Sequence, residues 1–287
     1  MNKASHLEMG VIENGIGRID AHTMTQIDFL SETLREVGAF AREQYNDRSR
    51  LSIAHKTDMN DLVTEVDLEV QRRVVERIAK AYPGDHVLAE ESGLSARPER
   101  HPERSWILDP IDGTQNFVRC LFPAWGLSLG LAEHGTVTTA GVYFPITDDL
   151  FLAERGAGAF RNGERLSVSS VHSVDAARVE FDISATPYRT NTLEAAPELY
   201  RRMGQIRIQG CAVAALCSVA TGDMEAYLHI SLNPWDYAAG ALIIEEAGGR
   251  CTRWNGEPLT YFEGRCDILA SNAAVHEEIL SLIHPQN

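Results

Sequence analysis

Cysteine is scarce in this chain and follows no pattern. Five cysteines occur among 287 residues, and no two of them stand in a CxxC spacing. An odd number without paired spacings argues against a disulfide framework and against a zinc site. The sequence therefore predicts a protein of a reducing compartment, whose thiols serve as small packing residues. The five are Cys120, Cys211, Cys217, Cys251 and Cys266.

Basic charge and long apolar runs are also lacking. The chain has 26 lysine and arginine residues against 41 aspartate and glutamate residues, which gives a net charge of −15. Such a balance disfavours nucleic acid and anionic membranes as partners and favours cations. No segment offers the ~20 apolar residues of a membrane-spanning helix, and residues 1–20 resemble no signal peptide. We therefore expect a cytoplasmic protein that binds neither nucleic acid nor a membrane.

The apolar residues that are present follow two periods. They make up 44% of the chain, and its length suits one large domain or two closely joined ones. Helical spacing predicts amphipathic helices over residues 27–45 and 65–81, and Asn162-Gly163 predicts a hairpin turn within residues 159–166. Short apolar runs predict the strands of this part. These are residues 86–89, 105–108, 125–132, 136–144 and 150–154.

The pattern changes near residue 170 to alternating strands and helices. Gly222 and the pair Gly248-Gly249 predict the ends of two helices. A strand-rich first part followed by an α/β second part predicts stacked layers of helix and sheet. We therefore divide the chain into a polar N-terminal extension (1–26), an α+β part (27–170) and an α/β part (171–287). The elements predicted in the last part are strands at 178–182, 206–209, 224–229 and 267–271, and helices at 211–222, 235–249 and 273–283.

Five carboxylates stand at the ends of predicted strands or at the start of a predicted helix. They are Glu90, Glu91, Asp109, Asp112 and Asp236. Taken singly, each has a structural explanation: a solvated loop edge for the two glutamates, a turn for Asp112 and a helix N-cap for Asp236. Gathered in one place, they would repel one another and raise one another's pKa unless a cation lay between them. Oxygen ligands without a nearby histidine or thiol favour Mg²⁺.

The stretch from Asp109 to Thr114 adds a second indication. Two aspartates on one bend can coordinate two metal ions. Pairs of metal ions in this arrangement stabilise the attacking and the leaving oxygen of a phosphate ester. Gly113 and Thr114 offer backbone N–H groups to a phosphate, more so if a helix begins at Thr114. The residues themselves therefore indicate Mg²⁺ and phosphate.

Two other kinds of site that use aspartates, the haloacid dehalogenase active site and the EF-hand calcium loop, can be tested against the spacing of Asp109 and Asp112. The haloacid dehalogenase signature D-x-D-G-T needs a nucleophilic aspartate two residues before the second aspartate, and Pro110 occupies that position before Asp112. An EF-hand calcium loop needs a different spacing from that of Asp109 and Asp112, and a closing glutamate that is absent. Both sites are excluded.

Three stretches of the chain resemble the signatures of the inositol monophosphatase family, in the family's order and spacing. Residues 56–67 resemble a fourth element, and the resemblance extends over residues 27–283. It implies a layered αβαβα sandwich of the inositol monophosphatase and fructose-1,6-bisphosphatase type. It also implies a lithium-sensitive, Mg²⁺-dependent phosphomonoesterase that acts without a covalent intermediate, commonly as a homodimer. The three stretches are residues 89–92 (AEES), 106–118 (WILDPIDGTQNFV) and 235–249 (WDYAAGALIIEEAGG).

The resemblance assigns metal ligands residue by residue. Glu90, Asp109 and the carbonyl of Ile111 would hold a first Mg²⁺, and Asp109, Asp112 and Asp236 a second. A third, more weakly bound ion would again use Glu90. The resemblance thus implies two to three Mg²⁺ ions in each active site.

Catalytic roles follow from the same resemblance. Gly113 and Thr114 would present N–H groups to the phosphate, and Thr114 with Asp67 would orient and deprotonate the attacking water. Lys56 would support the site electrostatically, although a solvent-exposed lysine is an equally good interpretation of that residue alone. With Glu90, these residues form the implied catalytic group.

The substrate is less well defined than the chemistry. The resemblance places a polyol against the turn Gly210-Cys211-Ala212, against Asp236 and against an acidic position that is His229 in this chain. An imidazole cannot replace a fixed carboxylate acceptor. The resemblance implies myo-inositol 1-phosphate as the first expectation, and His229 leaves histidinol phosphate, a sugar phosphate or bisphosphate and a nucleotide 3′-phosphate as open alternatives.

An alternative of another class is a metal-binding regulatory protein that kept the fold and lost turnover. Loss of a metal carboxylate or of Thr114 would favour it, and none of these residues is missing. Measurement of phosphate release separates the two interpretations.

Overall fold

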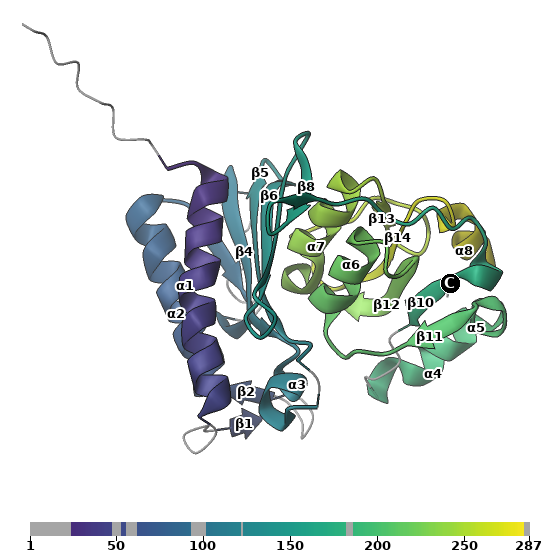
Figure 1. The fold of residues 1–287 in the computed structure, drawn as a ribbon, viewed down its shortest axis with the longest axis horizontal. Helices are drawn as coiled ribbons and strands as arrows, with labels where there is room; N and C mark the ends of the chain where they lie inside the picture. The colour runs from purple at the N-terminus through teal and green to yellow at the C-terminus, as the bar shows by residue number, and fades with distance from the viewer. Residues whose placement is uncertain are drawn as a thin grey trace, which may run out of the picture.

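The fold is a stack of layers in the order helix, sheet, helix, sheet, helix (Figure 1). The computed structural model describes residues 24–47, 53–55, 62–92, 102–121, 123–181 and 186–283. This architecture confirms the predicted layered α/β sandwich. The predicted N-terminal extension lies almost entirely outside the described residues.

The first helical layer consists of α1 (Gln26–Asn46) and α2 (Glu65–Ala81). Each begins at a threonine whose hydroxyl accepts backbone N–H groups of the first turn, Thr25 for α1 and Thr64 for α2. The apolar stripe of each helix is buried, and the two helices pack on each other and on one face of the first sheet. Both predicted helices are confirmed to within one residue at each end.

The first sheet contains seven strands in chain order, so each strand pairs with the next along the sequence. The first pair is parallel and the others are antiparallel. The predicted hairpin turn is confirmed, because Asn162 and Gly163 both have positive φ, at 50° and 85°. The strands are β3 (His86–Ala89), β4 (Arg104–Asp112), β5 (Gly126–Glu133), β6 (Thr136–Phe144), β7 (Asp149–Glu154), β8 (Gly158–Arg161) and β9 (Glu164–Arg165).

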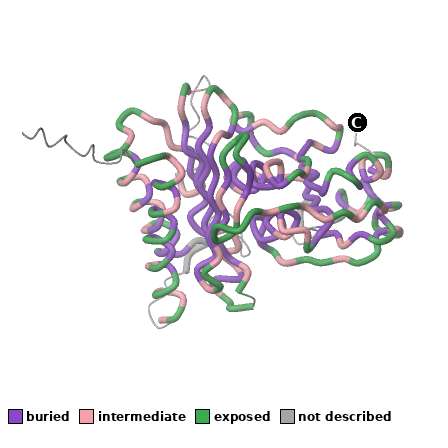
Figure 2. The backbone as a smooth tube through the Cα atoms, turned by 45° about the horizontal axis from the view of Figure 1, so that its top comes forward, coloured by how far each residue is buried: buried purple, intermediate pink, exposed green. Residues whose placement is uncertain are grey.

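The middle layer consists of α6 (Ala212–Ala220) and α7 (Pro234–Glu246), which lie between the two sheets (Figure 1). Nearly every residue of both helices is buried, and in Figure 2 the buried segments of the chain, in purple, gather in the interior of the molecule. α7 packs on β5 and β6, and α6 packs on α7 and on the second sheet. The positive φ of Gly222 and Gly248, 79° and 93°, confirms that these two glycines follow the helix ends.

The second sheet has the strand order β11-β10-β12-β14-β13, in which β10 runs parallel to both of its neighbours. Its outer face is covered by short helices, of which α4 packs on β12 and α8 on β14. The strands are β10 (Arg178–Phe181), β11 (Gln205–Arg207), β12 (Ala226–Leu232), β13 (Arg250–Thr252) and β14 (Cys266–Ser271). The helices are α4 (Thr186–Ala195), α5 (Pro197–Arg202) and α8 (His276–Leu282).

Several short elements were not predicted from the sequence. They are β1 (Ile53–His55) and β2 (Leu62–Thr64), which form a two-stranded sheet, together with α4, α5 and β13. Within the described ranges, no helix is long and apolar enough to cross a membrane. All five cysteines are free. Four are buried packing residues, but Cys120 is exposed, so the packing role predicted for it is wrong.

Candidate active site

The centre of the candidate site is the end of β4. This strand pairs in parallel with β3 as far as Ala89 and Leu108. Glu90 and Asp109 are therefore the residues that directly follow the paired parts of two adjacent strands. The pairing of β4 with β5 then shifts register between Asp109 and Asp112, an irregularity of the kind that re-aims side chains. The strand continues through Asp112. The prediction that Asp112 lies beyond the strand, on a bend, is therefore wrong.

Asp109 is the most deeply buried of these acids. Its side chain is only 2% exposed, and Oδ1 has no hydrogen-bond partner among the described residues. Burial raises the pKa of Asp109 well above its usual value, and the charges of Glu90, Asp112 and Asp236 raise it further. A buried carboxylate oxygen without a donor is costly unless a ligand supplies the missing charge.

Asp112 is held by the first turn of α6. Its Oδ2 accepts the backbone N–H of Val213, and the Cys211 thiol donates to the same oxygen across 3.5 Å. Burial raises the pKa of Asp112 to about 6, and the N–H and thiol donors limit the rise. Burial and the charge of Asp112 also raise the pKa of Cys211, so this thiol is protonated and unreactive at neutral pH.

Asp236 lies in the first turn of α7. The N-cap of this helix is Asn233, so the interpretation of Asp236 as the N-cap residue is wrong. Asp236 instead accepts the backbone N–H of Asn233 through Oδ2, at 2.8 Å, as the third residue of a capping box does. Burial raises the pKa of Asp236 well above its usual value, and the charges of Glu90 and Asp112 raise it further. The carboxylate therefore has a helix-capping role. It also belongs, with Asp109 and Asp112, to a group of acids that we call the acidic cluster.

Thr114 connects β4 with α2. Its hydroxyl oxygen lies 3.0 Å from the carbonyl of Ile111 and 3.3 Å from Oδ1 of Asp67. Asp67 is fully buried, and its other oxygen accepts the backbone N–H and the hydroxyl of Thr64. A helix, α3 (Thr114–Arg119), does begin at Thr114, after Gly113 in the left-handed conformation with φ 84°. The residues predicted to orient a water are thus brought together.

The turn Gly210-Cys211-Ala212 packs directly against this helix start. A Cβ atom on Gly113 would lie 3.1 Å from Cβ of Cys211, so only glycine allows this approach. The side-chain amide of Asn116 donates to the carbonyl of Gln209 at 2.8 Å, and so links α3 to the residue before the turn. The contact places the predicted substrate turn beside Asp112 and Gly113.

His229 lies on β12, seven residues before Asp236. The strand does not end at His229 as predicted but continues to Leu232, with a register shift after His229. The imidazole is 8% exposed, and its Nδ1 accepts the backbone N–H of Ser231 at 3.0 Å. This contact fixes the ring. The role of His229 in binding substrate stays a prediction.

Three observations bear on whether the acidic cluster fits a divalent cation. Oδ1 of Asp109, which no described residue binds, needs a positive partner, the cluster contains oxygen ligands, and Asp112 raises the pKa of both Asp109 and Asp236. In the described part of the chain, however, no three carboxylate, imidazole or thiol groups already surround one point. Asp112 and Asp236 each turn one oxygen to a backbone N–H instead. The donor set fits a hard cation, and each aspartate keeps a second oxygen for it.

Two functional groups were missed by sequence reasoning, and the predicted Lys56 lies outside the described residues. The backbone N–H of Val213 was missed because a backbone donor leaves no signal in the sequence. Asn116 was missed although it lies in the stretch 106–118, directly before the apolar Phe117, because its burial appears only in the structure.

Two cavities of the described region lie away from the acidic cluster. One, of about 290 Å³, runs along α6, and the other, of about 430 Å³, lies between α1 and β7. Neither is lined by the predicted metal ligands. We base the site on the carboxylates, because mutual repulsion between buried acids is a stronger sign of cation chemistry than cavity size.

The contact between α6 and α7 positions both Asp112 and Asp236, and it leads to a stability prediction. A Cβ atom on Gly240 would lie 2.6 Å from Cδ1 and 2.8 Å from Cβ of Leu216. We therefore expect Gly240→Ala to lower the free energy of unfolding by about 1–2 kcal/mol in urea titrations. Gly130→Ala is the matched control, since its Cβ would meet Val137 at 3.6 Å, an ordinary contact. Equal stability of the two variants would contradict the tight packing of α6 on α7.

Comparison with known proteins extends these observations. A sequence profile of the inositol monophosphatase family matches residues 21–287. The chain is 34% identical over 261 residues to the fructose-1,6-bisphosphatase/inositol-1-monophosphatase of Thermotoga maritima, covering 91% of this chain and 96% of that protein. It is 32% identical over 249 residues to the Nus factor SuhB of Escherichia coli, covering 86% and 91%. The crystal structure of inositol monophosphatase II from Staphylococcus aureus matches with a TM-score of 0.79 at 30% identity, over 90% and 93% of the two chains.

The profile, the relatives and the fold agree with one another and with the site. The matched region includes all the residues of the acidic cluster, and the layered sheets match those of a solved family member. This chain belongs to the inositol monophosphatase family, whose members are metal-dependent phosphatases.

Proposed function

We propose that the protein is a Mg²⁺-dependent phosphomonoesterase that hydrolyses a small phosphorylated metabolite, with myo-inositol 1-phosphate as the first candidate. The single observation that carries the proposal is the cluster formed by the buried Asp109 and the partly buried Asp112 and Asp236. These acids come from β4 and α7; Asp112 and Asp236 raise the pKa of Asp109, Asp112 raises that of Asp236, and no described residue binds Oδ1 of Asp109. A protein keeps such a cluster where a cation and an anionic substrate occupy it.

The residues around the cluster have distinct tasks in this proposal. Glu90, Asp109, the carbonyl of Ile111, Asp112 and Asp236 would hold two to three Mg²⁺ ions. When bound, these ions would supply positive charge to the phosphate oxygens and lower the pKa of a water molecule. Hard oxygen ligands and a net charge of −15 support Mg²⁺ over softer metals.

The phosphate and the attacking water would be oriented by the residues at the start of α3. Backbone N–H groups of Gly113 and Thr114 point from a helix start, where an anion is stabilised. The hydroxyl of Thr114 and the carboxylate of Asp67 would hold the water and accept its proton. The water would attack phosphorus in line, and no side chain would form a covalent intermediate.

Substrate choice rests on the turn 210–212, on Asp236 and on His229. Inositol 1-phosphate is named for the Thermotoga relative together with fructose 1,6-bisphosphate, which supports a polyol or sugar phosphate. Histidinol phosphate and a nucleotide 3′-phosphate remain alternatives. Cytoplasmic location, lithium sensitivity and a homodimer are further predictions for this chain.

The test is phosphate release from a panel of these monoesters with Mg²⁺ and after chelation. We expect turnover of at least one member only with Mg²⁺, and inhibition by Li⁺. No phosphate release from any substrate despite Mg²⁺ binding would support the alternative of a metal-binding regulatory protein. The similarity to a relative named as a Nus factor is the observation that favours this alternative. Equal turnover with and without Mg²⁺ would contradict the proposed chemistry.

His229→Glu tests the substrate assignment. A carboxylate at this position restores a fixed acceptor for a polyol hydroxyl. We expect kcat/KM for inositol 1-phosphate to rise about tenfold relative to that for a sugar phosphate, which corresponds to one charged hydrogen bond. The matched control is His229→Gln, which has similar size without charge. An unchanged ranking of substrates in both variants would remove His229 from the specificity argument.

A further inference from the structure

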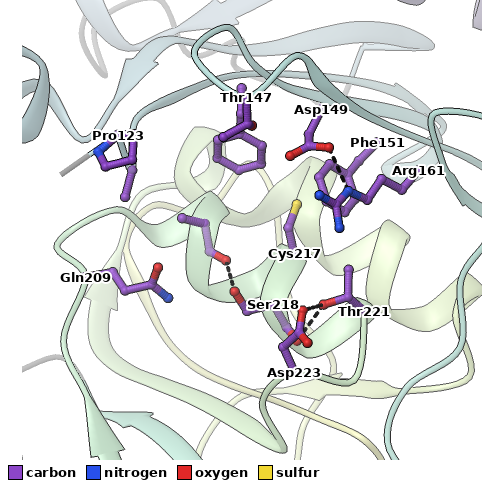
Figure 3. A pocket seen from close by; sticks show the side chains of 13 residues that line it. Pro123, Thr147, Asp149, Phe151, Arg161, Gln209, Cys217, Ser218, Thr221 and Asp223 are labelled. Atoms are coloured by element: carbon purple, nitrogen blue, oxygen red, sulfur yellow. Dashed lines mark hydrogen bonds and ion pairs between the residues drawn. The ribbon is translucent and has the colours of Figure 1, made fainter.

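A cavity of about 290 Å³ lies between the first sheet and α6, and the proposed phosphatase chemistry does not use it (Figure 3). Phe144, Phe151 and Arg161 line it from the sheet. From α6 and the turn that follows it come Ala214, Cys217, Ser218 and Thr221. These four positions are spaced i, i+3, i+4 and i+7, which is one face of a helix. Neither Val213, whose backbone N–H binds Asp112, nor any of the predicted metal ligands lines the cavity.

Arg161 lines this cavity with a side chain that is 44% exposed. Its Nε donates to Oδ1 of Asp149 at 2.8 Å, and the guanidinium lies over the ring of Phe151 at 5.7 Å. Among the described residues, its two terminal nitrogens make no hydrogen bond. The ring and the ion pair hold the guanidinium in place, and its outer edge stays open to an anionic group.

Asp223 presents the opposite charge from the helix side. The hydroxyl of Thr221 donates to its Oδ2 at 2.6 Å, and its Oδ1 accepts no hydrogen bond from the described part of the chain. Figure 3 shows Asp223 and Arg161 on opposite walls. The charge of Asp223, after that of Asp149, raises the pKa of Arg161, yet the two side chains form no ion pair within the described residues. A cation and an anion therefore face each other across the cavity without touching.

We propose that this cavity binds a small zwitterionic amino acid, with its carboxylate on Arg161, its ammonium group on Asp223 and its aliphatic side chain against Phe144 and Phe151. The two charges of such a ligand complement the two walls, and the apolar lining suits a short aliphatic side chain. The volume leaves room for the ligand and for water molecules of about 30 Å³ each.

Other ligand classes fit less well. A phosphate dianion would meet Arg161 but would bring two negative charges near Asp149 and Asp223, whereas the single carboxylate of an amino acid is offset by its own ammonium group. A simple amine would leave the donors of Arg161 unused, and a simple carboxylate would leave Asp223 unpaired. Only a ligand that carries both charges uses both walls.

The test is isothermal titration of the full chain in Mg²⁺ with three probes of the same skeleton: L-valine, 3-methylbutanoate and 2-methylpropylamine. The second probe lacks the ammonium group of valine and the third lacks the carboxylate. We expect L-valine to bind at least about tenfold more tightly than either, because each of them loses one charged contact. No heat with L-valine, or equal affinity for all three probes, would overturn the inference.

Variants identify the site. Arg161→Met and Asp223→Asn are each expected to weaken L-valine binding about tenfold or more. The control Asp175→Asn changes an exposed aspartate that pairs with Arg202, outside the cavity, and should leave the affinity unchanged. Asp109→Asn should also keep L-valine binding, since Asp109 belongs to the acidic cluster and does not line the cavity. Unchanged affinity in Arg161→Met and Asp223→Asn variants that keep the wild-type melting temperature, or loss of binding in Asp109→Asn, would refute this location.

Discussion

Replacing Asp109 by asparagine is expected to reduce kcat/KM for phosphate release about 1000-fold. The amide keeps the shape of the side chain but removes the charge that would hold two Mg²⁺ ions, and a loss of roughly 4 kcal/mol of transition-state stabilisation corresponds to three powers of ten. The measurement is steady-state phosphate release at saturating Mg²⁺, paired with titration calorimetry of Mg²⁺ binding, which should weaken in parallel.

Stability separates this effect from misfolding. In the metal-free protein Asp109 is buried among acids that raise its pKa, and none of the residues that the structure describes binds its Oδ1. A neutral amide avoids the cost of burying a charge there. We therefore expect the metal-free Asp109→Asn variant to melt at the same temperature as the wild type or above it. Wild-type activity in this variant would contradict the assignment of Asp109, and a lower melting temperature would show that its carboxylate stabilises the fold directly.

Replacing Thr114 by valine is expected to lower kcat about 100-fold while changing KM by less than about threefold. Valine matches threonine in shape, but it lacks the hydroxyl that contacts Asp67 Oδ1 and the carbonyl of Ile111. Without it, the water would lose one of the two groups that orient it and receive its proton. Phosphate binding by backbone N–H groups would persist, which is why the expected change lies in kcat.

Thr114→Ser is the matched control, since it keeps the hydroxyl and removes only a methyl group. It should retain activity within about threefold of the wild type. A loss as large as that of Thr114→Val would point to the methyl group and to packing of α3, and full activity in Thr114→Val would exclude Thr114 from water activation.

Helix α6 contributes both to the proposed amino-acid cavity and to the binding of Asp112 in the acidic cluster, so a variant of one site can disturb the other. The backbone N–H of Val213 in the first turn of this helix binds Asp112, while Ala214 and Ser218 line the cavity. Variants of the cavity should therefore be assayed for phosphate release as well as for ligand binding, so that a displaced helix is recognised.

Periodicity alone predicted the long elements well. Both helices of the first layer follow an apolar stripe and a threonine cap that act locally, and α1 and α2 begin and end within one residue of the prediction. The hairpin at Asn162-Gly163 is also local, because these two residues readily adopt positive φ. Short elements without such signals, among them β13 and α5, were not predicted, since their pairing and packing partners are distant in sequence.

Helix periods, turn residues and motif spacing were enough to predict the layered fold, the family and the identity of the acids, because all three are local features of the chain. Three contacts emerged only in the folded protein: β4 continues through Asp112, Asp236 accepts a backbone N–H from Asn233, and the N–H of Val213 binds Asp112. They could not be predicted because they join a strand, a helix start and a turn that meet only when α6 and α7 dock between the two sheets. A backbone donor has no side-chain signature, and the burial that raises the pKa of Asp109 exists only after that docking.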